Sequence, residues 1–259
     1  MSRRKTLLTA LRRAGAVLSR RFGKVTYRQK RRADLLTAAD LESQRVVLGL
    51  IARAHPDDDF MAEEDEVKLT GAERLWIVDP LDGTTNYAHG YPASCVSIGL
   101  LRRGVPELGG VYDPFRRELF VAERGKGAFL NGKRLSVTRV PKVADSLLIT
   151  GFAYDRAERP DFYLKRFKAF MTRSHDVRRS GSAALDMAWI AAGRADGFWE
   201  FKLNPWDVAA GRLVVTEAGG RVTDFSGREW KDWRAMGGET LATNGRVHAE
   251  MLRILRRTR

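Results

Sequence analysis

An apolar run at residues 75–78 leads directly into two aspartates, Asp79 and Asp82, and a Gly-Thr-Thr turn at residues 83–85 follows. The run predicts a buried strand, so the fold must bring both carboxylates to the end of one strand. Carboxylate oxygens are ligands that Mg²⁺ prefers, and backbone N–H groups at a turn or helix start bind phosphate. An Asp-Gly pair alone is usually an ordinary turn. The whole string predicts a metal-assisted phosphate site.

Further carboxylates stand at the ends of other periodic segments. Glu63 follows an apolar pair upstream, and Asp207 opens an apolar helix-like run far downstream. Together with Asp79 and Asp82, they could converge on two or three cations. By spacing alone, however, Asp40 is explained better as a helix cap or ion-pair partner, and Asp207 as a first-turn acid that interacts with the helix dipole.

These segments resemble the signatures of the inositol monophosphatase family, within a wider superfamily of Mg²⁺-dependent, lithium-sensitive sugar phosphatases. The motifs occur in family order over nearly the whole chain, at residues 36–40, 62–65, 76–86, 125–132, 179–184, 206–211 and 217–220. The resemblance implies an α/β fold, the layered α-β-α-β-α sandwich of the inositol monophosphatase / fructose-1,6-bisphosphatase type.

The resemblance also implies the cofactor, two or three Mg²⁺ ions, and a set of ligands for it. Glu63, Asp79 and the carbonyl of Leu81 would bind the first ion, and Asp79, Asp82 and Asp207 the second, with Asp79 bridging the two. Glu63 would also contact a third, loosely held ion through water. Without cations, four clustered carboxylates would repel one another and raise some of their pKa values.

Catalytic and phosphate-binding roles carry over in the same way. Thr84 would orient the attacking water, Asp40 would accept its proton from behind Thr84, and Glu63 belongs to the same catalytic group. The backbone N–H groups of Gly83 and Thr84 would hold the phosphate, aided by the dipole of a short helix. No covalent phosphoenzyme is needed. Residues 180–182 loosely resemble a serine nucleophile motif, but the strand elbow and His partner of such a site are not evident.

Substrate selection is expected in the second half of the chain. Glu200 matches the family's carboxylate that bonds sugar hydroxyls, although by position alone it could end an exposed strand. Ala183 would line the same pocket as Asp207, and Arg178 would support its wall. A carboxylate that faces vicinal hydroxyls fits a polyol, and it rejects analogues that leave buried groups unpaired.

The implied activity is hydrolysis of a small-molecule phosphate ester, with inositol 1-phosphate as the favoured substrate. Relatives with nearly the same metal ligands act on fructose 1,6-bisphosphate, histidinol phosphate or 3′-phosphoadenosine 5′-phosphate, and these are the alternatives. One departure from the family is the basic stretch at residues 24–32, where the family has a flexible loop near the active site. That stretch leaves room for a substrate with extra negative charge.

Positive charge is concentrated at the N-terminus. The formal net charge is +14, and residues 1–32 contain twelve Lys or Arg and no acid. Such a face attracts polyanions, and some bacterial relatives associate with transcription machinery. An RNA- or transcription-complex-binding protein that retains the phosphatase fold is therefore the alternative from another class. Apolar residues recur at helical spacing in this segment, which favours a surface helix with a solvated basic face, so nucleic acid is a possible partner that is not favoured.

Periodicity predicts the order of elements. The first half would contain a helix from about residue 7, a basic loop, a helix over 39–54, strands at 60, 75–78, 94–101, 109–112 and 118–122, and a hairpin turn at 131–132. The second half would alternate strands at 147–153, 175–178 and 197–201 with helices over 161–171, 182–192 and 206–218, and would end in a helix from about 247. The change of pattern near Lys142 predicts two halves of one intimate catalytic unit. Residues 1–142 would form an α+β half with most metal ligands, and residues 143–259 an α/β half with Asp207 and the substrate pocket.

Cysteine use and hydropathy predict the compartment. The single cysteine, Cys95, excludes an internal disulfide framework and suits a reducing cytosol. It lies in an apolar strand-like run, which makes it a buried hydrophobe rather than a nucleophile. No apolar stretch reaches the ~18 residues of a membrane span. We therefore expect a cytoplasmic protein with no membrane partner, and the family resemblance implies a homodimer.

Overall fold

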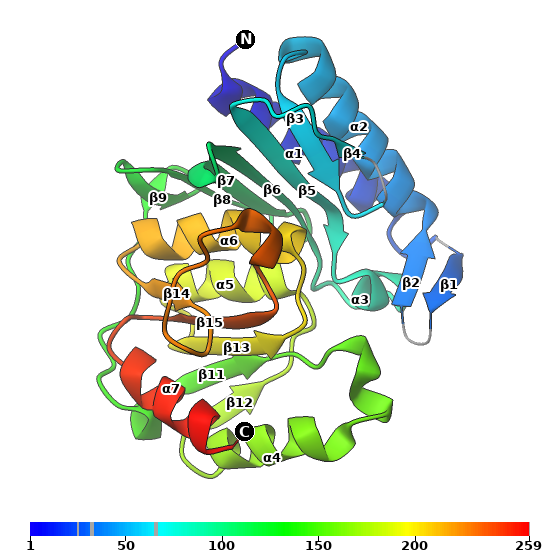
Figure 1. Ribbon diagram of the computed structural model, residues 1–259. Coiled ribbons are helices and arrows are strands. Elements are labelled where there is room, and N and C mark those ends of the chain that lie inside the picture. The colour runs from blue at the N-terminus through cyan, green and yellow to red at the C-terminus, as the bar shows by residue number, and fades with distance from the viewer. Residues whose placement is uncertain (25, 32–33, 65–66, 259) are drawn as a thin grey trace.

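The computed structural model describes residues 1–24, 26–31, 34–64 and 67–258, which form alternating layers of helices and sheets (Figure 1). Helices α1 and α2 cover an eight-stranded sheet, α5 and α6 fill the space between it and a five-stranded sheet, and α4 and α7 cover the far side. This is the α-β-α-β-α order that the resemblance implies, so the expected fold class is confirmed.

The first sheet has the strand order β10-β9-β8-β7-β6-β5-β3-β4. All neighbours are antiparallel except β3 and β5, which run parallel. The strands are β3 Asp59–Ala62, β4 Val67–Lys68, β5 Arg74–Asp82, β6 Cys95–Arg102, β7 Val105–Asp113, β8 Glu118–Glu123, β9 Gly127–Leu130 and β10 Lys133–Arg134. Asn131 and Gly132 form the expected turn between β9 and β10, with φ of 49° and 84°, the left-handed backbone of tight hairpins.

The second sheet has the strand order β12-β11-β13-β15-β14. Here β11 is parallel to both β12 and β13, whereas β15 is antiparallel to β13 and β14. The strands are β11 Leu147–Thr150, β12 Asp176–Arg178, β13 Gly197–Phe201, β14 Arg221–Thr223 and β15 Glu239–Thr243. Parallel neighbours need crossover connections, and α4 and α5 supply them after β11 and β12.

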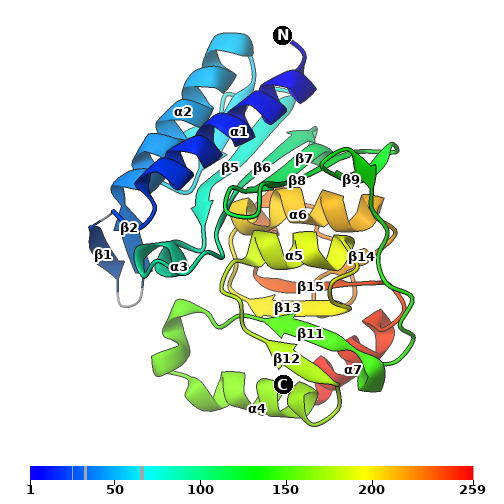
Figure 2. The same ribbon diagram turned by 180° about the vertical axis from the view of Figure 1, so that it is seen from behind.

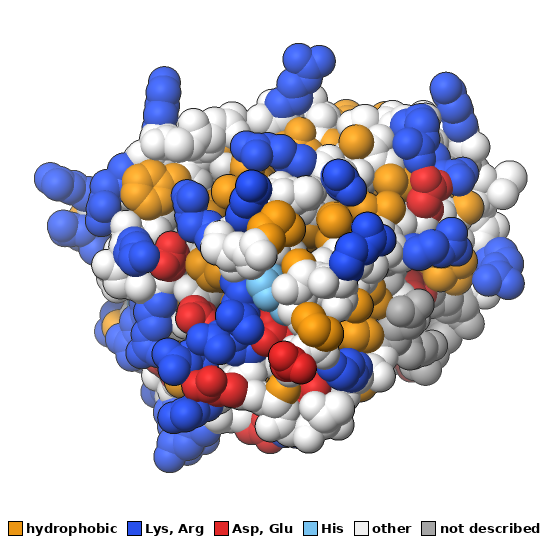
Figure 3. Space-filling view, turned by 90° about the horizontal axis from the view of Figure 1, so that it is seen from above, with side chains coloured by type: hydrophobic (Ala, Val, Ile, Leu, Met, Phe, Trp, Pro, Cys, Tyr) orange, Lys and Arg blue, Asp and Glu red, His pale blue; other side chains and the backbone are white. Residues whose placement is uncertain are grey.

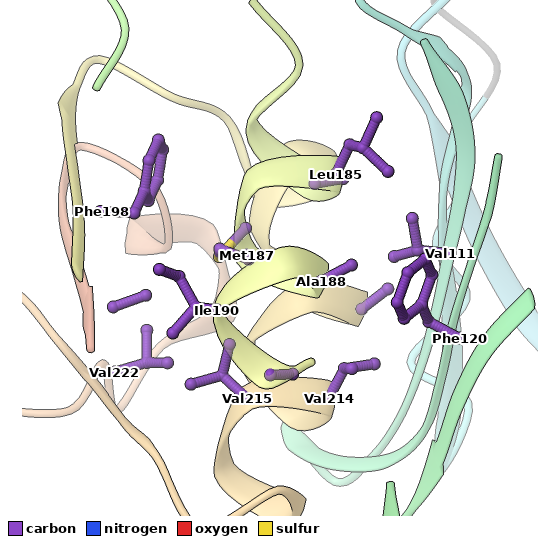
Figure 4. Packing of buried hydrophobic residues seen from close by; sticks show 14 of the residues in the cluster. Val111, Phe120, Leu185, Met187, Ala188, Ile190, Phe198, Val214, Val215 and Val222 are labelled. Carbon is purple, nitrogen blue, oxygen red and sulfur yellow. The ribbon is translucent and has the colours of Figure 1, made fainter. Parts of the chain in front are cut away.

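The two central helices are apolar on both sides because both sides are buried. Figure 4 shows Ala188 of α5 pointing toward Val111 and Phe120 of the first sheet, and Ile190 pointing toward Phe198 of the second. The helices are α1 Arg3–Arg21, α2 Ala38–Ala54, α3 Thr84–Ala88, α4 Pro160–Met171, α5 Ala183–Ala191, α6 Pro205–Glu217 and α7 His248–Arg257.

Helix α6 lies close against the first sheet because two strand residues lack side chains. A Cβ at Gly99 would lie 2.8 Å from the Cβ of Ala209, and one at Gly109 would lie 2.9 Å from the carbonyl oxygen of Ala210. Gly99 also pairs with Ile77 of β5. This close contact therefore holds the N-terminal half of α6 against the sheet that contains the aspartate-bearing strand.

Two segments differ from the sequence-based expectation. The basic loop expected over residues 24–32 contains strand β1, Tyr27–Arg31, which pairs with β2, Asp34–Thr37; residues 25, 32 and 33 lie outside the described residues. Residues 27–31 are mostly charged and show no alternation of apolar and polar side chains, so the strand signal was absent from the sequence. The strand expected over 147–153 ends at Thr150, because the chain then turns to form a cavity wall. Among the described residues, no helix is both long and apolar enough to span a bilayer.

Candidate active site

The chain turns sharply at Gly83, where β5 ends. The Leu81 N–H donates to Asp79 Oδ1 at 3.0 Å, which begins the turn. Gly83 then adopts a φ of 88° as the cap of α3, a conformation that glycine reaches without a steric penalty. A Cβ at Gly83 would also lie 2.9 Å from the carbonyl oxygen of Ala93. Both conformation and space therefore require glycine here.

A cavity of about 320 Å³ lies where β5 and β13 end and where α5 and α6 begin. Asp40 is buried behind its wall, next to Thr84. Apart from Arg178, the other residues singled out from the sequence line the cavity: Glu63, Asp79, Leu81, Asp82, Gly83, Thr84, Ala183, Glu200 and Asp207. The tertiary fold thus brings together side chains from segments more than a hundred residues apart.

Three of these carboxylates form a tight cluster. Asp79, Asp82 and Asp207 each offer an oxygen within 4.8 Å of the others, and Asp79 is only 1% exposed. Burial, followed by the charges of Glu63, Asp82 and Asp207, raises the pKa of Asp79 well above its usual range. Burial also raises the pKa of Asp82. Burial and the charge of Asp82 raise the pKa of Asp207 to about 7.

This donor set fits a hard divalent cation. All three cluster donors are carboxylate oxygens, which Mg²⁺ prefers over softer ligands. A cation between them would relieve the mutual repulsion that contributes to their raised pKa values. Glu63 lines the same cavity, close enough for its charge to act on Asp79.

One oxygen of Asp82 is held by groups whose role the sequence did not reveal. Asp82 Oδ2 accepts hydrogen bonds from Ser182 Oγ at 2.6 Å and from the Ala184 N–H at 2.7 Å. The buried Cys95 thiol lies 3.9 Å from the same oxygen. Ser182 therefore donates its proton to a carboxylate, which is a holding role and not that of a nucleophile. The Ser-Ala-Ala motif was the available signal, but it did not identify the partner.

Asp40 uses its two oxygens for different partners. Oδ2 accepts hydrogen bonds from the Thr37 N–H at 2.8 Å and the Thr37 hydroxyl at 2.6 Å, within a capping box at the start of α2. Oδ1 lies 3.2 Å from Thr84 Oγ1, which also has the Leu81 carbonyl at 3.0 Å as an acceptor. Burial raises the pKa of Asp40 to about 6. Helix capping and contact with Thr84 are therefore compatible.

Asp207 combines two roles in the same manner. Its Oδ2 accepts the Asn204 N–H at 2.6 Å, which completes a capping box at the start of α6. The capping bond uses one oxygen only. Asp207 can therefore cap α6 and still belong to the carboxylate cluster.

Glu200 is a buried wall residue and does not end an exposed strand. Its exposed fraction is 9%, and a Cβ at Gly151 would lie 2.1 Å from both of its carboxylate oxygens. The carboxylate thus occupies the space that a side chain at position 151 would fill. Burial raises the pKa of Glu200 well above its usual range, and the charge of Arg179 opposes that shift.

The expected place of Arg178 in the pocket wall is wrong. Its side chain is 57% exposed and pairs with Asp176 at the surface, whereas the next residue, Arg179, lines the cavity. Successive side chains of an extended segment point in opposite directions, so the cavity wall contains the arginine one position after the expected one. Composition offered no way to tell the two arginines apart.

Comparison with known proteins places this site in a family. The model of the inositol monophosphatase family matches residues 2–258. An inositol-1-monophosphatase of Synechocystis sp. is 44% identical, with 95% of this chain and 85% of the relative covered. The Nus factor SuhB of Pseudomonas aeruginosa is 42% identical, with 85% of this chain and 84% of the relative covered.

Solved structures agree with the sequence relatives. The inositol monophosphatase from Anabaena superimposes with a TM-score of 0.86 at 46% identity, over 96% of this chain and 93% of that one. An IMPase/NADP phosphatase solved with Mg²⁺ and phosphate has a TM-score of 0.83 at 27% identity, over 97% of this chain and 94% of that one. With the family model matched along almost its entire length, this chain belongs to the inositol monophosphatase family.

Proposed function

We propose that the chain is a Mg²⁺-dependent phosphate monoester hydrolase whose preferred substrate is inositol 1-phosphate. The observation that carries the proposal is the cluster of buried Asp79 and Asp82 with half-buried Asp207, in the same cavity as the turn at Gly83 and Thr84. Two or three Mg²⁺ ions would be held by this cluster together with Glu63 and the Leu81 carbonyl. When bound, they supply positive charge that polarises the phosphate ester and stabilises the leaving oxygen.

Thr84 and Asp40 would accept and transfer the proton of the attacking water. Thr84 Oγ1 accepts a hydrogen bond from the water and donates its own proton toward Asp40 Oδ1, 3.2 Å away. With a pKa of about 6, Asp40 is ionised at pH 8 and can accept that proton. The water oxygen bonds to phosphorus, the ester P–O bond breaks, and the departing alkoxide takes a proton from solvent. No side chain becomes covalently attached to the phosphate.

Gly83 and Thr84 would orient the phosphate through backbone N–H groups, while Ala183 and Glu200 would face the polyol. A neutral polyol presents hydroxyl groups that can both donate and accept. Buried Glu200 would lose a partner with any analogue that lacks the matching hydroxyl, and an unmatched buried carboxyl is costly. Inositol 1-phosphate is favoured because a relative that is 44% identical to this chain is named as an inositol-1-monophosphatase.

Phosphate release tests this proposal directly. The assay uses inositol 1-phosphate, fructose 1,6-bisphosphate, histidinol phosphate and 3′-phosphoadenosine 5′-phosphate at pH 8, with and without Mg²⁺ and with added Li⁺. We expect Mg²⁺-dependent, Li⁺-sensitive turnover that is fastest with inositol 1-phosphate and is lost in Asp82→Asn. The control, Asp145→Asn, changes an exposed aspartate that does not line the cavity. Full activity of Asp82→Asn would contradict the ligand set, and a folded protein that binds Mg²⁺ yet hydrolyses none of the four esters would contradict the function.

RNA binding is a second candidate, favoured by the charge of the outer helical layer. Helices α1 and α2 lie side by side on the outer face of the first sheet (Figure 2). Their exposed side chains include Lys5, Arg12, Arg13, Arg45 and Arg53. Lys and Arg are also spread over the face in Figure 3, with fewer acidic side chains among them. The name of the SuhB relatives points the same way.

Salt dependence tests the second candidate. If the basic layer neutralises four phosphates of a single strand, RNA affinity should fall roughly 50-fold between ~50 and ~200 mM salt. The variant Arg12→Ala/Arg13→Ala should bind RNA more weakly than the wild type at each salt concentration, with no change in phosphate release. RNA affinity that does not change with salt concentration, or no RNA binding at low salt, would reject RNA as a partner of this layer.

A further inference from the structure

Asn86, the last residue of the motif at 76–86, has no role in the chemistry proposed above. It lies inside α3, although an asparagine within a helix usually competes with the helix for backbone hydrogen bonds. Its Nδ2 instead donates to two carbonyls outside α3, that of Ala93 at 2.8 Å and that of Ser180 at 2.7 Å. Both N–H groups of the amide are therefore used, each on a different segment of the chain.

These two segments meet at the turn that ends β5. The Ala93 carbonyl oxygen lies 2.9 Å from the position of a Cβ at Gly83, and the Gly181 carbonyl oxygen lies 3.2 Å from the same position. The Ser94 hydroxyl donates to the Gly83 carbonyl at 2.9 Å. The Asn86 amide therefore joins the two segments that enclose this turn, one before β6 and one before α5.

The segment that Asn86 holds also carries the partners of Asp82. Ser182 Oγ and the Ala184 N–H donate to Asp82 Oδ2 at 2.6 and 2.7 Å. Asp82 itself ends β5, the strand that leads into α3 and Asn86. The carboxylate and its two donors therefore come from opposite sides of the contact that Asn86 bridges. A shift of one side against the other would change the length of both hydrogen bonds to Asp82.

Gly181 makes room for the Asn86 side chain. A Cβ at Gly181 would lie 3.0 Å from Asn86 Nδ2 and 3.1 Å from Oδ1. Gly181 also has a φ of 90°, a conformation that favours glycine. Backbone conformation and space at position 181 thus both suit a close approach of the Asn86 amide to the Ser180 carbonyl.

We propose that Asn86 is a positioning residue, which fixes the segment at 180–184 against α3 so that Ser182 and Ala184 orient Asp82 for Mg²⁺. Asn86 itself would touch neither the metal nor the substrate. Residues that orient a metal ligand change the metal affinity when they are removed, although they make no bond to the ion. The inference rests on the metal site of the proposed function and extends it to a residue that acts through Ser182.

Calorimetric titration of Mg²⁺ into the metal-free protein tests the inference. Asn86→Ala should lower Mg²⁺ affinity at least about 5-fold, and Asn86→Leu, which nearly keeps the side-chain volume, should do the same. Asn244→Ala is the matched control, because Asn244 Nδ2 also donates to two acceptors, Thr138 Oγ1 and the Val140 carbonyl, but does not line the cavity. The control should change Mg²⁺ affinity less than about 2-fold, even where it lowers the Tm.

A double-mutant cycle separates positioning from a general loss of stability. If Asn86 acts through Ser182, the fold-loss of Mg²⁺ affinity in Asn86→Ala/Ser182→Ala should be smaller than the product of the two single losses. A loss equal to that product would overturn the inference. Unchanged Mg²⁺ affinity in a folded Asn86 variant would overturn it as well, and would leave the proposed function standing.

Hydrogen exchange decides the inference if the wild type does not bind Mg²⁺, a result that would contradict the proposed function by itself. In metal-free protein, the Ala184 N–H should exchange at least about 5-fold faster in Asn86→Ala than in Asn244→Ala, because the segment at 180–184 opens more easily when α3 does not hold it. Faster exchange supports the link from Asn86 to the donors of Asp82, and equal rates in the two variants reject it.

Discussion

Replacing Ser182 by Ala should weaken Mg²⁺ binding, although Ser182 is not expected to touch the metal. The Ser182 hydroxyl and the Ala184 N–H hold Oδ2 of Asp82 at 2.6 and 2.7 Å, which directs the other oxygen into the cavity. Ser182→Ala removes one hydrogen bond to a charged group, worth about 1.5–3 kcal/mol. The backbone bond remains, so the carboxylate keeps part of its orientation.

The expected result is a 10- to 100-fold loss of Mg²⁺ affinity, the range observed when a residue that orients a metal ligand is removed. Isothermal titration calorimetry of Mg²⁺ into metal-free protein at pH 8 measures this without requiring turnover. Ser182→Thr keeps the hydroxyl in an extended conformation, φ −143°, that a β-branched residue tolerates. It should restore most of the affinity.

Ser180→Ala is the matched control, since the Ser180 hydroxyl donates to Asp186, outside the carboxylate cluster. It should change Mg²⁺ affinity less than about 2-fold, because it leaves every bond to Asp82 in place. Thermal unfolding of each variant checks that the protein is folded. Unchanged Mg²⁺ affinity in folded Ser182→Ala, or the same loss in Ser180→Ala, would refute the reasoning that Ser182 positions Asp82.

Four further predictions follow from single features of the site and core. The pKa of Asp40 is raised from 3.8 to about 6, so its ionisation destabilises the native state increasingly as pH rises from about 3.8 to about 6. Asp40→Asn should abolish turnover yet raise the free energy of unfolding at pH 8 by up to about 3 kcal/mol. A lower free energy of unfolding for the variant in urea titrations would contradict this. Activity of the wild type should fall on the acid side with an apparent pKa near 6, the value for Asp40, and a rate that stays flat down to pH 5 would exclude Asp40 as the proton acceptor. Gly151→Ala would place a Cβ 2.1 Å from the Glu200 carboxylate and so displace that carboxylate. The variant should raise the KM for inositol 1-phosphate about 10-fold with little change in Mg²⁺ affinity. An unchanged KM would mean that Glu200 does not face the polyol. Burial lowers the pKa of His248 to about 4, so the stability that comes from its neutral form is present above pH 6.5. About 3 kcal/mol of the free energy of unfolding is lost as pH falls toward 4. In urea unfolding, the free energy of unfolding of His248→Gln should fall less than that of the wild type between pH 7 and 4.5.

Local patterns were sufficient for most of the elements, the β1–β2 hairpin excepted, and for the ligands that lie on them. The helix over residues 206–218 and the strand at 197–201 were expected from periodicity and correspond to α6 Pro205–Glu217 and β13 Gly197–Phe201. The family resemblance extended this to the layered fold. The order of the two sheets and the antiparallel return of β15 onto β13 depend on contacts between distant segments, which periodicity does not encode.

The features of the candidate site also fall into those set by local sequence and those set by contacts between distant segments. The sequence by itself determined which carboxylates end a strand or open a helix, because strand length, glycine turns and capping are short-range properties. Only the tertiary structure decided that Ser182 holds Asp82, that Gly151 makes room for Glu200, and that Arg179 rather than Arg178 reaches the cavity. Each of these depends on which side chains meet across a distance of many residues, and such a meeting is set by packing between layers rather than by the residues next to it in the chain.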